Sequence, residues 1–167
     1  SLRPISERKP LLLEGCVKGT PAKMHFCSTD DAALVRIDET IDALKAEGYK
    51  DIVILTSKIE STSILKSKVK DGIYRNKYRF TTCRKFKGLE ADAIILIDVD
   101  NKTFNSENVL IYYVGTSRAR LRLDIITQLT NDDCTDILKN VLNHTSKIHN
   151  PKRKLASALN ATGSIAD

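Results

Sequence analysis

Two unbroken aliphatic runs constrain the fold of this chain more than any other feature. One is Ile-Val-Ile-Leu within residues 51–56 (DIVILT), and the other is Ile-Ile-Leu-Ile at residues 94–97. A strand with one face in water alternates apolar and polar residues, whereas a strand that is covered on both faces is apolar throughout. The runs therefore predict two inner strands of a parallel sheet that has helices on both faces.

Helical and strand-like patterns alternate along the rest of the chain. Leu34, Ile37, Ile41 and Leu44 recur at steps of three and four residues, which predicts a helix that ends at Gly48. Further strands are expected at 23–27, 78–83 and 121–126, and further helices at 59–69, at 107–119 and after Thr130. The alternation predicts an α/β fold, specifically a doubly wound, mostly parallel sheet of about five strands.

The two ends of the chain are less regular than its middle. Residues 1–22 are punctuated by prolines and glycines and are expected to form an irregular lead-in. Residues 23–143 hold the alternating pattern and are expected to form one domain. Residues 144–167 are polar, basic and weakly patterned, which predicts a flexible tail.

Charge and cysteine content narrow the function classes. The chain has 27 Lys and Arg against 21 Asp and Glu, and this mild excess permits an anionic partner without requiring one. No apolar run approaches the roughly 18 residues of a membrane span, so no membrane partner is expected. The four cysteines form no C-x-x-C pair and the three histidines lack metal-ligand spacing, which predicts reduced thiols in a cytoplasmic protein and no metal site.

No glycine-rich phosphate loop of the form G-x-x-x-x-G-K-[ST] or G-x-G-x-x-G occurs. If the fold handles a nucleotide, it lacks the part that normally holds the β- and γ-phosphates. Ligands of doubly wound sheets bind beyond the carboxyl ends of the strands, where Thr56, the loop 82–90, Asp98 and Asp100 are expected. Asp98 and Asp100 are interpreted as ordinary strand-ending acids in preference to a metal site.

Residues 73–87 (IYRNKYRFTTCRKFK) combine six cations with four aromatic residues and contain no acid. Cations can meet phosphates and aromatic rings can stack on unpaired bases, so the segment suits nucleic acid. A strand with its aromatic residues inward and its cations in solvent explains the same alternation without any ligand. Arg118, Arg120 and Arg122 likewise allow two interpretations, namely cations at a helix C-terminus or a guanidinium aimed at a phosphate.

Two stretches resemble conserved helicase motifs. TTCRKFKGLEADAIIL, from residue 81, resembles the fifth motif of UvrD/Rep-type superfamily-one DNA helicases, and YVGTSRARLRL, from residue 113, resembles their sixth. DIVILT resembles a strand that lies earlier in the same domain. The resemblance covers residues 20–130 and implies the second, carboxyl-terminal of two RecA-like domains, with ATP bound in the cleft between them.

The resemblance also implies roles for individual residues. Arg118 would be the catalytic arginine finger, and Gly88 and Glu90 would lie on the ATP side, with Glu90 at the ribose hydroxyl. The nucleic-acid-binding residues, on the backbone of single-stranded DNA, would be Thr82, Arg84, Lys85 and Lys87, of which Lys87 could support either ligand. ATP and Mg²⁺ would be bound mainly by an upstream RecA-like domain, which is an expected partner, so the isolated chain is predicted to be inactive as an ATPase.

Some residues depart from the helicase pattern. Arg84 stands where the family usually has His, Ser117 replaces Thr, and the stretch between Thr56 and Tyr78 is short where longer members insert a subdomain. The arginine of the fourth motif has no match in residues 1–22. An alternative is therefore a degenerate helicase-fold module that binds nucleic acid or docks a partner without ATP chemistry. A small-molecule enzyme is disfavoured, because the sequence shows neither a phosphate loop nor a nucleophile–base pair.

Overall fold

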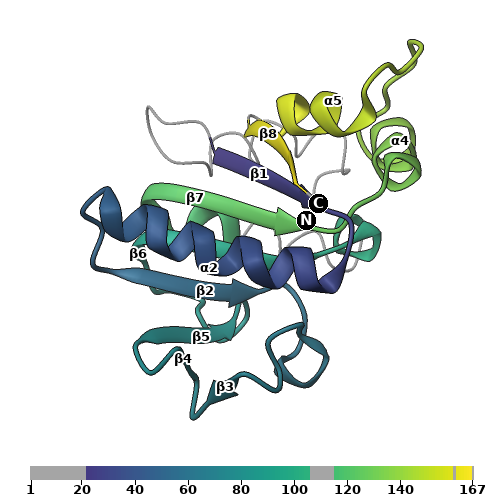
Figure 1. Ribbon diagram of the computed structural model, residues 1–167. Coiled ribbons are helices and arrows are strands. Elements are labelled where there is room, and N and C mark those ends of the chain that lie inside the picture. The colour runs from purple at the N-terminus through teal and green to yellow at the C-terminus, as the bar shows by residue number, and fades with distance from the viewer. Residues whose placement is uncertain (1–21, 106–114, 160, 167) are drawn as a thin grey trace.

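A single sheet runs through the computed structural model, which describes residues 22–105, 115–159 and 161–166 (Figure 1). Its eight strands in the described part of the chain lie in the order β3-β4-β5-β2-β6-β7-β1-β8. The strands are β1 (Ala22–Cys27), β2 (Ile52–Thr56), β3 (Val69–Lys70), β4 (Ile73–Tyr74), β5 (Tyr78–Thr82), β6 (Ala91–Val99), β7 (Ala119–Thr127) and β8 (Ala161–Ala166).

The sheet is mostly parallel, as predicted. All pairings from β5 across to β8 are parallel, and only β3 and β4 pair antiparallel, with each other and with β5. The predicted number of about five strands is wrong, because the short β3 and β4 and the C-terminal β8 extend the sheet at its two sides. β2 lies between β5 and β6, and all five of its residues are buried, which confirms that its aliphatic run marks an inner strand.

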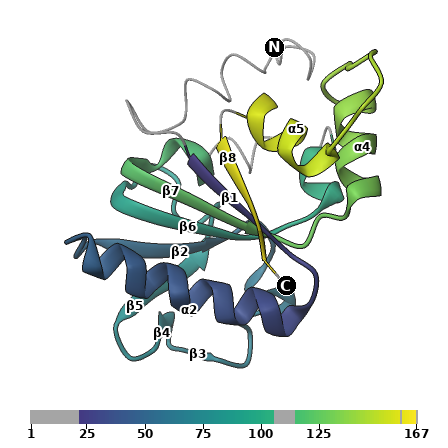
Figure 2. The ribbon, with the colours of Figure 1, turned by 45° about the horizontal axis from the view of Figure 1, so that its top comes forward.

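Helices cover both faces of the sheet (Figure 2). On one face, α2 (Asp30–Ala46) packs Ile37, Ile41 and Leu44 into a core shared with β2, β6 and β5. On the other face, α4 (Asn131–Asn140) and α5 (Pro151–Ala158) bury Ile137, Leu138 and Leu155 against β1, β6 and β7. The prediction of helices on both faces is confirmed.

The C-terminal segment corrects the sequence-based expectation of a flexible tail. α5 buries Leu155 and Ala156, Leu159 directly after it is also buried, and β8 pairs in parallel with β1 along its full length. The backbone bonds of β8 depend little on sequence, so a mostly polar segment can still join the sheet. Residues 1–21 lie outside the described residues, so the lead-in stays a prediction, as does the boundary of the domain.

Two of the predicted helices are not present as expected among the described residues. The helix expected at 59–69 is wrong: this stretch holds the short 3₁₀ helix η2 (Glu60–Thr62), a turn and β3. Of the helix expected at 107–119, residues 107–114 lie outside the described residues, 115–117 are helical, and β7 already begins at Ala119. No helix among the described residues is both long enough and apolar enough to cross a membrane.

Candidate nucleotide and nucleic-acid sites

The loop at residues 83–90 connects opposite ends of the sheet. It leaves β5 after Thr82, which lies beside Thr56 at the carboxyl ends of the strands. It enters β6 at Ala91, which lies beside Ala119 at the amino ends. β6 has nine residues, and at about 3.3 Å per residue the two ends of the sheet lie about 26 Å apart. The expectation that the whole loop lies beyond the carboxyl ends is therefore wrong, since a connection between parallel strands must return to the amino end.

The carboxyl end of the sheet carries a hollow of about 310 Å³, called here the carboxyl-end hollow. Thr82 and Arg84 both line it, as the predicted nucleic-acid site requires. Thr82 is only 8% exposed, and its Oγ1 accepts a hydrogen bond from the backbone N–H of Lys85 at 3.1 Å. The remaining lining residues are Ser57, Lys58, Ile59, Thr62, Cys83, Asp100, Lys102 and Thr103.

The cations around this hollow differ in how they are held. Lys85 Nζ lies 2.7 Å from a carboxylate oxygen of Glu60, and Lys58 Nζ lies 3.3 Å from one of Asp100. Both pairs are substantially exposed, so each stabilises the fold by at most about 1 kcal/mol. Arg84 is exposed and makes no ion pair with any described residue. Lys87 is also exposed, but it lies further along the loop and does not line the hollow.

Two buried side chains fix the loop so that its cations point outward. Cys83 and Phe86 are buried in the core on the face that α4 and α5 cover. The backbone N–H of Phe86 donates to the Thr82 carbonyl at 3.1 Å, and that of Leu89 donates to the Phe86 carbonyl at 3.0 Å. Burial raises the pKa of the Cys83 thiol to about 12, so this group is a protonated packing element and not a nucleophile.

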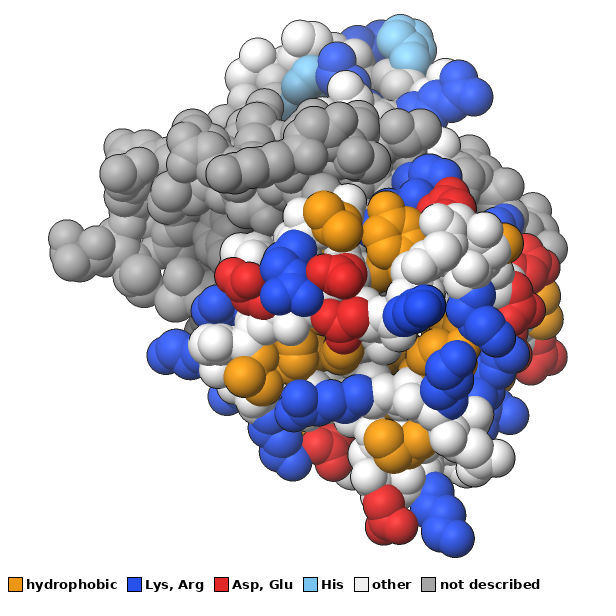
Figure 3. Space-filling view, turned by 90° about the vertical axis from the view of Figure 1, so that its left-hand side faces the viewer, with side chains coloured by type: hydrophobic (Ala, Val, Ile, Leu, Met, Phe, Trp, Pro, Cys, Tyr) orange, Lys and Arg blue, Asp and Glu red, His pale blue; other side chains and the backbone are white. Residues whose placement is uncertain are grey.

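At the amino end of the sheet, the loop turns at Gly88. The φ angle of Gly88 is 84°, in the left-handed region, while a Cβ there would have no atom within 4 Å. Glycine is thus favoured by backbone conformation and not by space. Leu89 and Glu90 are exposed and line a second hollow of about 320 Å³, called the amino-end hollow, with Lys50, Asp51, Ile52, Val53, Lys77, Tyr78, Arg79 and Phe86. Figure 3 views the molecule from the amino end, where acidic side chains lie among Lys and Arg.

Arg118 lies next to Glu90 in the sheet. Its backbone carbonyl accepts a hydrogen bond from Ala91, the residue after Glu90, at 3.1 Å. The Nε of Arg118 is buried and makes no hydrogen bond with the described residues, although the side chain as a whole is only partly buried. The structure therefore brings together the backbones of the two residues assigned to the nucleotide. Arg118 does not line the amino-end hollow.

The two neighbouring arginines have structural partners. Arg120 donates to Asp92 at 2.9 Å and to Asp51 at 3.2 Å. Arg122 is buried and donates to Asp124 at 3.0 Å and to Glu47 at 2.8 Å. Burial alone would lower the pKa of Arg122, but these two carboxylates raise it above its ordinary value. Of the three arginines that could meet a phosphate, only Arg118 has no carboxylate partner among the described residues.

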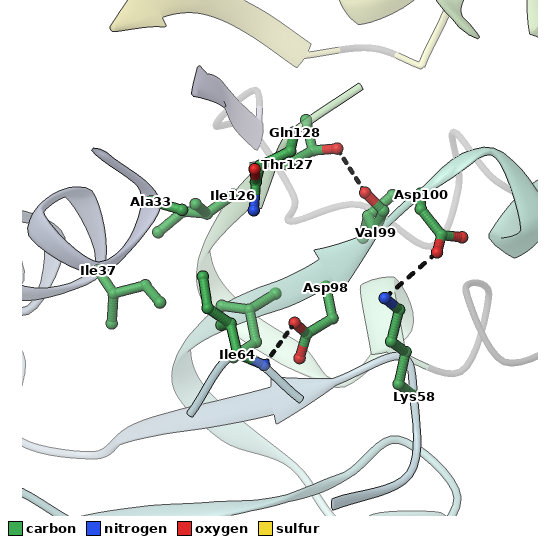
Figure 4. A pocket seen from close by; sticks show the side chains of 11 residues that line it. Ala33, Ile37, Lys58, Ile64, Asp98, Val99, Asp100, Ile126, Thr127 and Gln128 are labelled. Atoms are coloured by element: carbon green, nitrogen blue, oxygen red, sulfur yellow. Dashed lines mark hydrogen bonds and ion pairs between the residues drawn. The ribbon is translucent and has the colours of Figure 1, made fainter. Parts of the chain in front are cut away.

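The acids after the β6 run have structural roles (Figure 4). Asp98 has a φ of 63° at an irregularity of the β6–β7 pairing, and its carboxylate accepts hydrogen bonds from the loop that follows β2. Asp100 caps the 3₁₀ helix η3 (Asn101–Phe104) through the backbone N–H groups of Lys102 and Thr103. No group of three or more His, Cys, Asp or Glu side chains in the described residues could hold a metal ion.

Sequence reasoning missed the residues that face Thr82 and Arg84 across the carboxyl-end hollow. Ile59 and Thr62 come from the stretch 59–69, which was predicted as a helix, and Ser57 and Lys58 directly precede it. The available signal was its composition: residues 57–63 (SKIESTS) have four hydroxyl side chains, which favour turns and caps over helix interiors.

Part of the chain matches the model of a known protein family. Residues 77–126 match the family model of the UvrD-like helicase C-terminal domain. This segment contains β5, the 83–90 loop, β6 and Arg118. The chain therefore carries a region of the UvrD-like helicase C-terminal type, and the resemblance inferred from the sequence is confirmed.

A solved structure supports the fold assignment. The crystal structure of the C-terminal domain of a possible DNA helicase from Lactobacillus plantarum WCFS1 is similar to this chain, with a TM-score of 0.59. The similarity covers 86% of this chain and 96% of that one at 14% sequence identity, so it concerns the fold alone. No curated protein matches the chain significantly.

Proposed function

We propose that this chain is the second RecA-like domain of an ATP-dependent DNA helicase or translocase. In this role it contributes an arginine finger, part of an ATP site and part of a track for single-stranded DNA. The rest of the ATP site comes from an upstream RecA-like domain. The thiols of Cys83 and Cys134 are buried and form no disulfide among the described residues, which suits the reducing cytoplasm as its location.

The observation that carries the proposal is the position beside Glu90 of Arg118, whose buried Nε has no hydrogen-bond partner among the described residues. A buried guanidinium N–H without an acceptor costs free energy, and a phosphate oxygen would satisfy it. Glu90 is exposed and its carboxylate can accept a hydrogen bond from a ribose hydroxyl. The residues present thus fit the edge of a nucleotide site, although none of them forms a phosphate cradle.

In catalysis, Arg118 would stabilise charge that grows on the phosphoryl oxygens. Bound ATP would supply the scissile phosphoanhydride, and Mg²⁺ would neutralise negative charge on its phosphates. The planar guanidinium of Arg118 can donate two parallel hydrogen bonds to phosphate oxygens. An arginine in this role contributes about 10³ to 10⁵ in rate. The ion pairs of Arg120 with Asp51 and Asp92 lie next to Arg118 on the chain and would help to fix its backbone.

At the opposite end of the sheet, Thr82 and Arg84 would bind the phosphate backbone of single-stranded DNA. The 83–90 loop would then connect the two ligands, because one continuous segment of eight residues joins Thr82 to Ala91. Domain closure on ATP and reopening after hydrolysis would move this loop with the domain and so shift the strand.

The purified chain provides the first test. It should bind a labelled single-stranded oligonucleotide with an affinity that falls as salt rises, and it should show no ATPase activity above background. ATP turnover by the chain alone would contradict the assignment of the missing half-site to another domain. Salt-sensitive binding that is unaffected by Arg84→Ala would contradict the assignment of the carboxyl-end hollow to nucleic acid.

A further inference from the structure

The loop at residues 57–65 forms the wall of the carboxyl-end hollow that faces Arg84. It contributes Ser57, Lys58, Ile59 and Thr62 to the lining. The ion pair of Lys85 with Glu60, at 2.7 Å, connects this wall to the 83–90 loop. The two walls therefore stand at a defined separation on either side of the hollow.

Asp98 holds the 57–65 loop in place from the neighbouring strand. Its Oδ2 accepts hydrogen bonds from the hydroxyls of Thr56 and Ser63, each at 2.6 Å. Its Oδ1 accepts one from the backbone N–H of Ile64 at 3.0 Å, and its backbone carbonyl accepts one from the Ser57 hydroxyl at 2.9 Å. The left-handed backbone of Asp98, with φ at 63°, is uncommon for a residue with a side chain. One strained residue thus fixes both ends of the loop.

The loop presents an apolar side chain and a cation side by side at the hollow. Ile59 is 61% exposed, the highest value among the exposed large hydrophobic residues of the described chain. Lys58, next to it, forms an exposed ion pair with Asp100, which a phosphate could replace. An exposed apolar side chain next to cations suits a ligand with both apolar bases and phosphates, which is single-stranded nucleic acid.

We propose that the 57–65 loop is a second contact for single-stranded nucleic acid, with Lys58 at a phosphate and Ile59 against a base. Asp98 is the positioning residue that presents them. The inference rests on the proposed nucleic-acid site at Thr82 and Arg84, and it adds the opposite wall of the same hollow to that site.

Fluorescence anisotropy of the full chain with a labelled oligothymidine, measured across a series of salt concentrations, tests the inference. Lys58→Ala should lower the slope of log affinity against log salt by about 0.7, the value for one phosphate contact on a single strand. Ile59→Ala should weaken binding about threefold to tenfold with no change in slope, because it removes only apolar contact. Lys68→Ala, which changes an exposed cation outside the hollow, is the matched control and should alter neither quantity.

Variants of Asp98 separate positioning from contact. Asp98→Gly tolerates the positive φ but removes the carboxylate, so it should weaken binding at least as much as Ile59→Ala. Asp98→Asn keeps the side-chain shape and one acceptor oxygen, and it should lie between Asp98→Gly and the unmodified chain. If the Asp98 variants only destabilised the fold, their melting temperatures would fall, but their oligonucleotide affinities would not follow this order. If Asp98→Gly does not fold, the Lys58 and Ile59 variants decide the question alone.

The outcomes separate the inference from the function on which it rests. If Arg84→Ala weakens binding while Lys58→Ala and Ile59→Ala behave as the unmodified chain, the 57–65 loop is not a contact and the inference is overturned. If the chain does not bind the oligothymidine, or binds it independently of Arg84, the nucleic-acid site itself is wrong and the inference falls with it.

Discussion

The two ends of the 83–90 loop differ in how their charged groups are held. At the carboxyl end, Lys58 and Lys85 are paired with carboxylates in exposed contacts, and Arg84 has no ion-pair partner among the described residues. At the amino end, Arg120 is bound to two carboxylates, while the buried Nε of Arg118 has no hydrogen-bond partner in the part of the chain that the structure describes.

This difference suits two different ligands. Exposed, exchangeable cations fit a phosphate backbone that must be bound and released repeatedly. A guanidinium that is held in place at the beginning of a strand is suited to stabilise negative charge that develops at one position in a transition state. A short loop can place side chains at both ends of the sheet, about 26 Å apart, because the connection between parallel strands has to return from the carboxyl end to the amino end.

Substitution of Arg118 is expected to produce the largest effect and tests the difference between the two ends of the 83–90 loop most clearly. In the proposed two-domain protein, Arg118→Ala should lower DNA-stimulated ATPase turnover by about 10³-fold or more, because the proposed role of the arginine is to stabilise transition-state charge. Oligonucleotide affinity should stay within about twofold, since the proposal assigns DNA to the opposite end of the sheet. Arg120→Ala, an exposed and ion-paired neighbour, is the control and should retain most turnover.

The packing of the segment before Arg118 against the start of the 83–90 loop can be tested at Gly115. A Cβ at this position would lie 2.9 Å from Cys83 Sγ and 3.2 Å from Leu96 Cδ1, so the segment before Arg118 touches the start of the 83–90 loop. Gly115→Ala should destabilise the chain by about 1–3 kcal/mol through overpacking. Combination with Cys83→Ala should cost less than the sum of the two changes, as measured by urea unfolding. Additive costs would show that the two segments are not in contact.

Loss of Arg84 should have an intermediate effect that is confined to the carboxyl end. Arg84→Ala should weaken oligonucleotide binding about fivefold to tenfold at low salt and lower the salt slope by about 0.7. Lys87→Ala, on the same loop but outside the hollow, should change affinity less. Equal effects of the two substitutions would mean that binding follows net charge and not the hollow.

The smallest effect is expected from a change that releases a cation at the carboxyl end. Asp100→Asn should strengthen oligonucleotide binding about twofold to threefold at low salt, because Lys58 would lose its carboxylate partner. Asn also caps helices well, so the melting temperature should change little. Weaker binding of this variant would contradict the role assigned to Lys58.

The inner part of the fold could be predicted from the sequence because burial on both faces leaves a direct signature. The runs at 52–55 and 94–97 became β2 and β6, and the 3.6-residue period at Leu34, Ile37, Ile41 and Leu44 became α2. β8 could not be predicted in the same way, because an added side strand is joined by backbone bonds and needs few apolar residues.

The candidate site could be predicted in part. The resemblance to helicase motifs led to the assignment of Thr82, Arg84, Glu90 and Arg118, which stays a prediction. It did not show that these residues divide between opposite ends of the sheet, because that depends on strand direction. The 57–65 loop was missed because its conformation depends on Asp98, which is more than thirty residues away in the sequence. Such a tertiary contact leaves no local pattern, and the apolar spacing around Ile59, Ile64 and Leu65 was interpreted as a helix.

Amide hydrogen exchange of the full chain with and without oligothymidine tests the separation of the two ends most directly. The oligonucleotide should slow exchange at residues 57–64 and 82–87, whereas amides at 89–92 and 117–120 should exchange as in the free chain. Protection centred on 89–92 and 117–120 would place nucleic acid at the amino end and would contradict the central claim that one loop separates the two ligands.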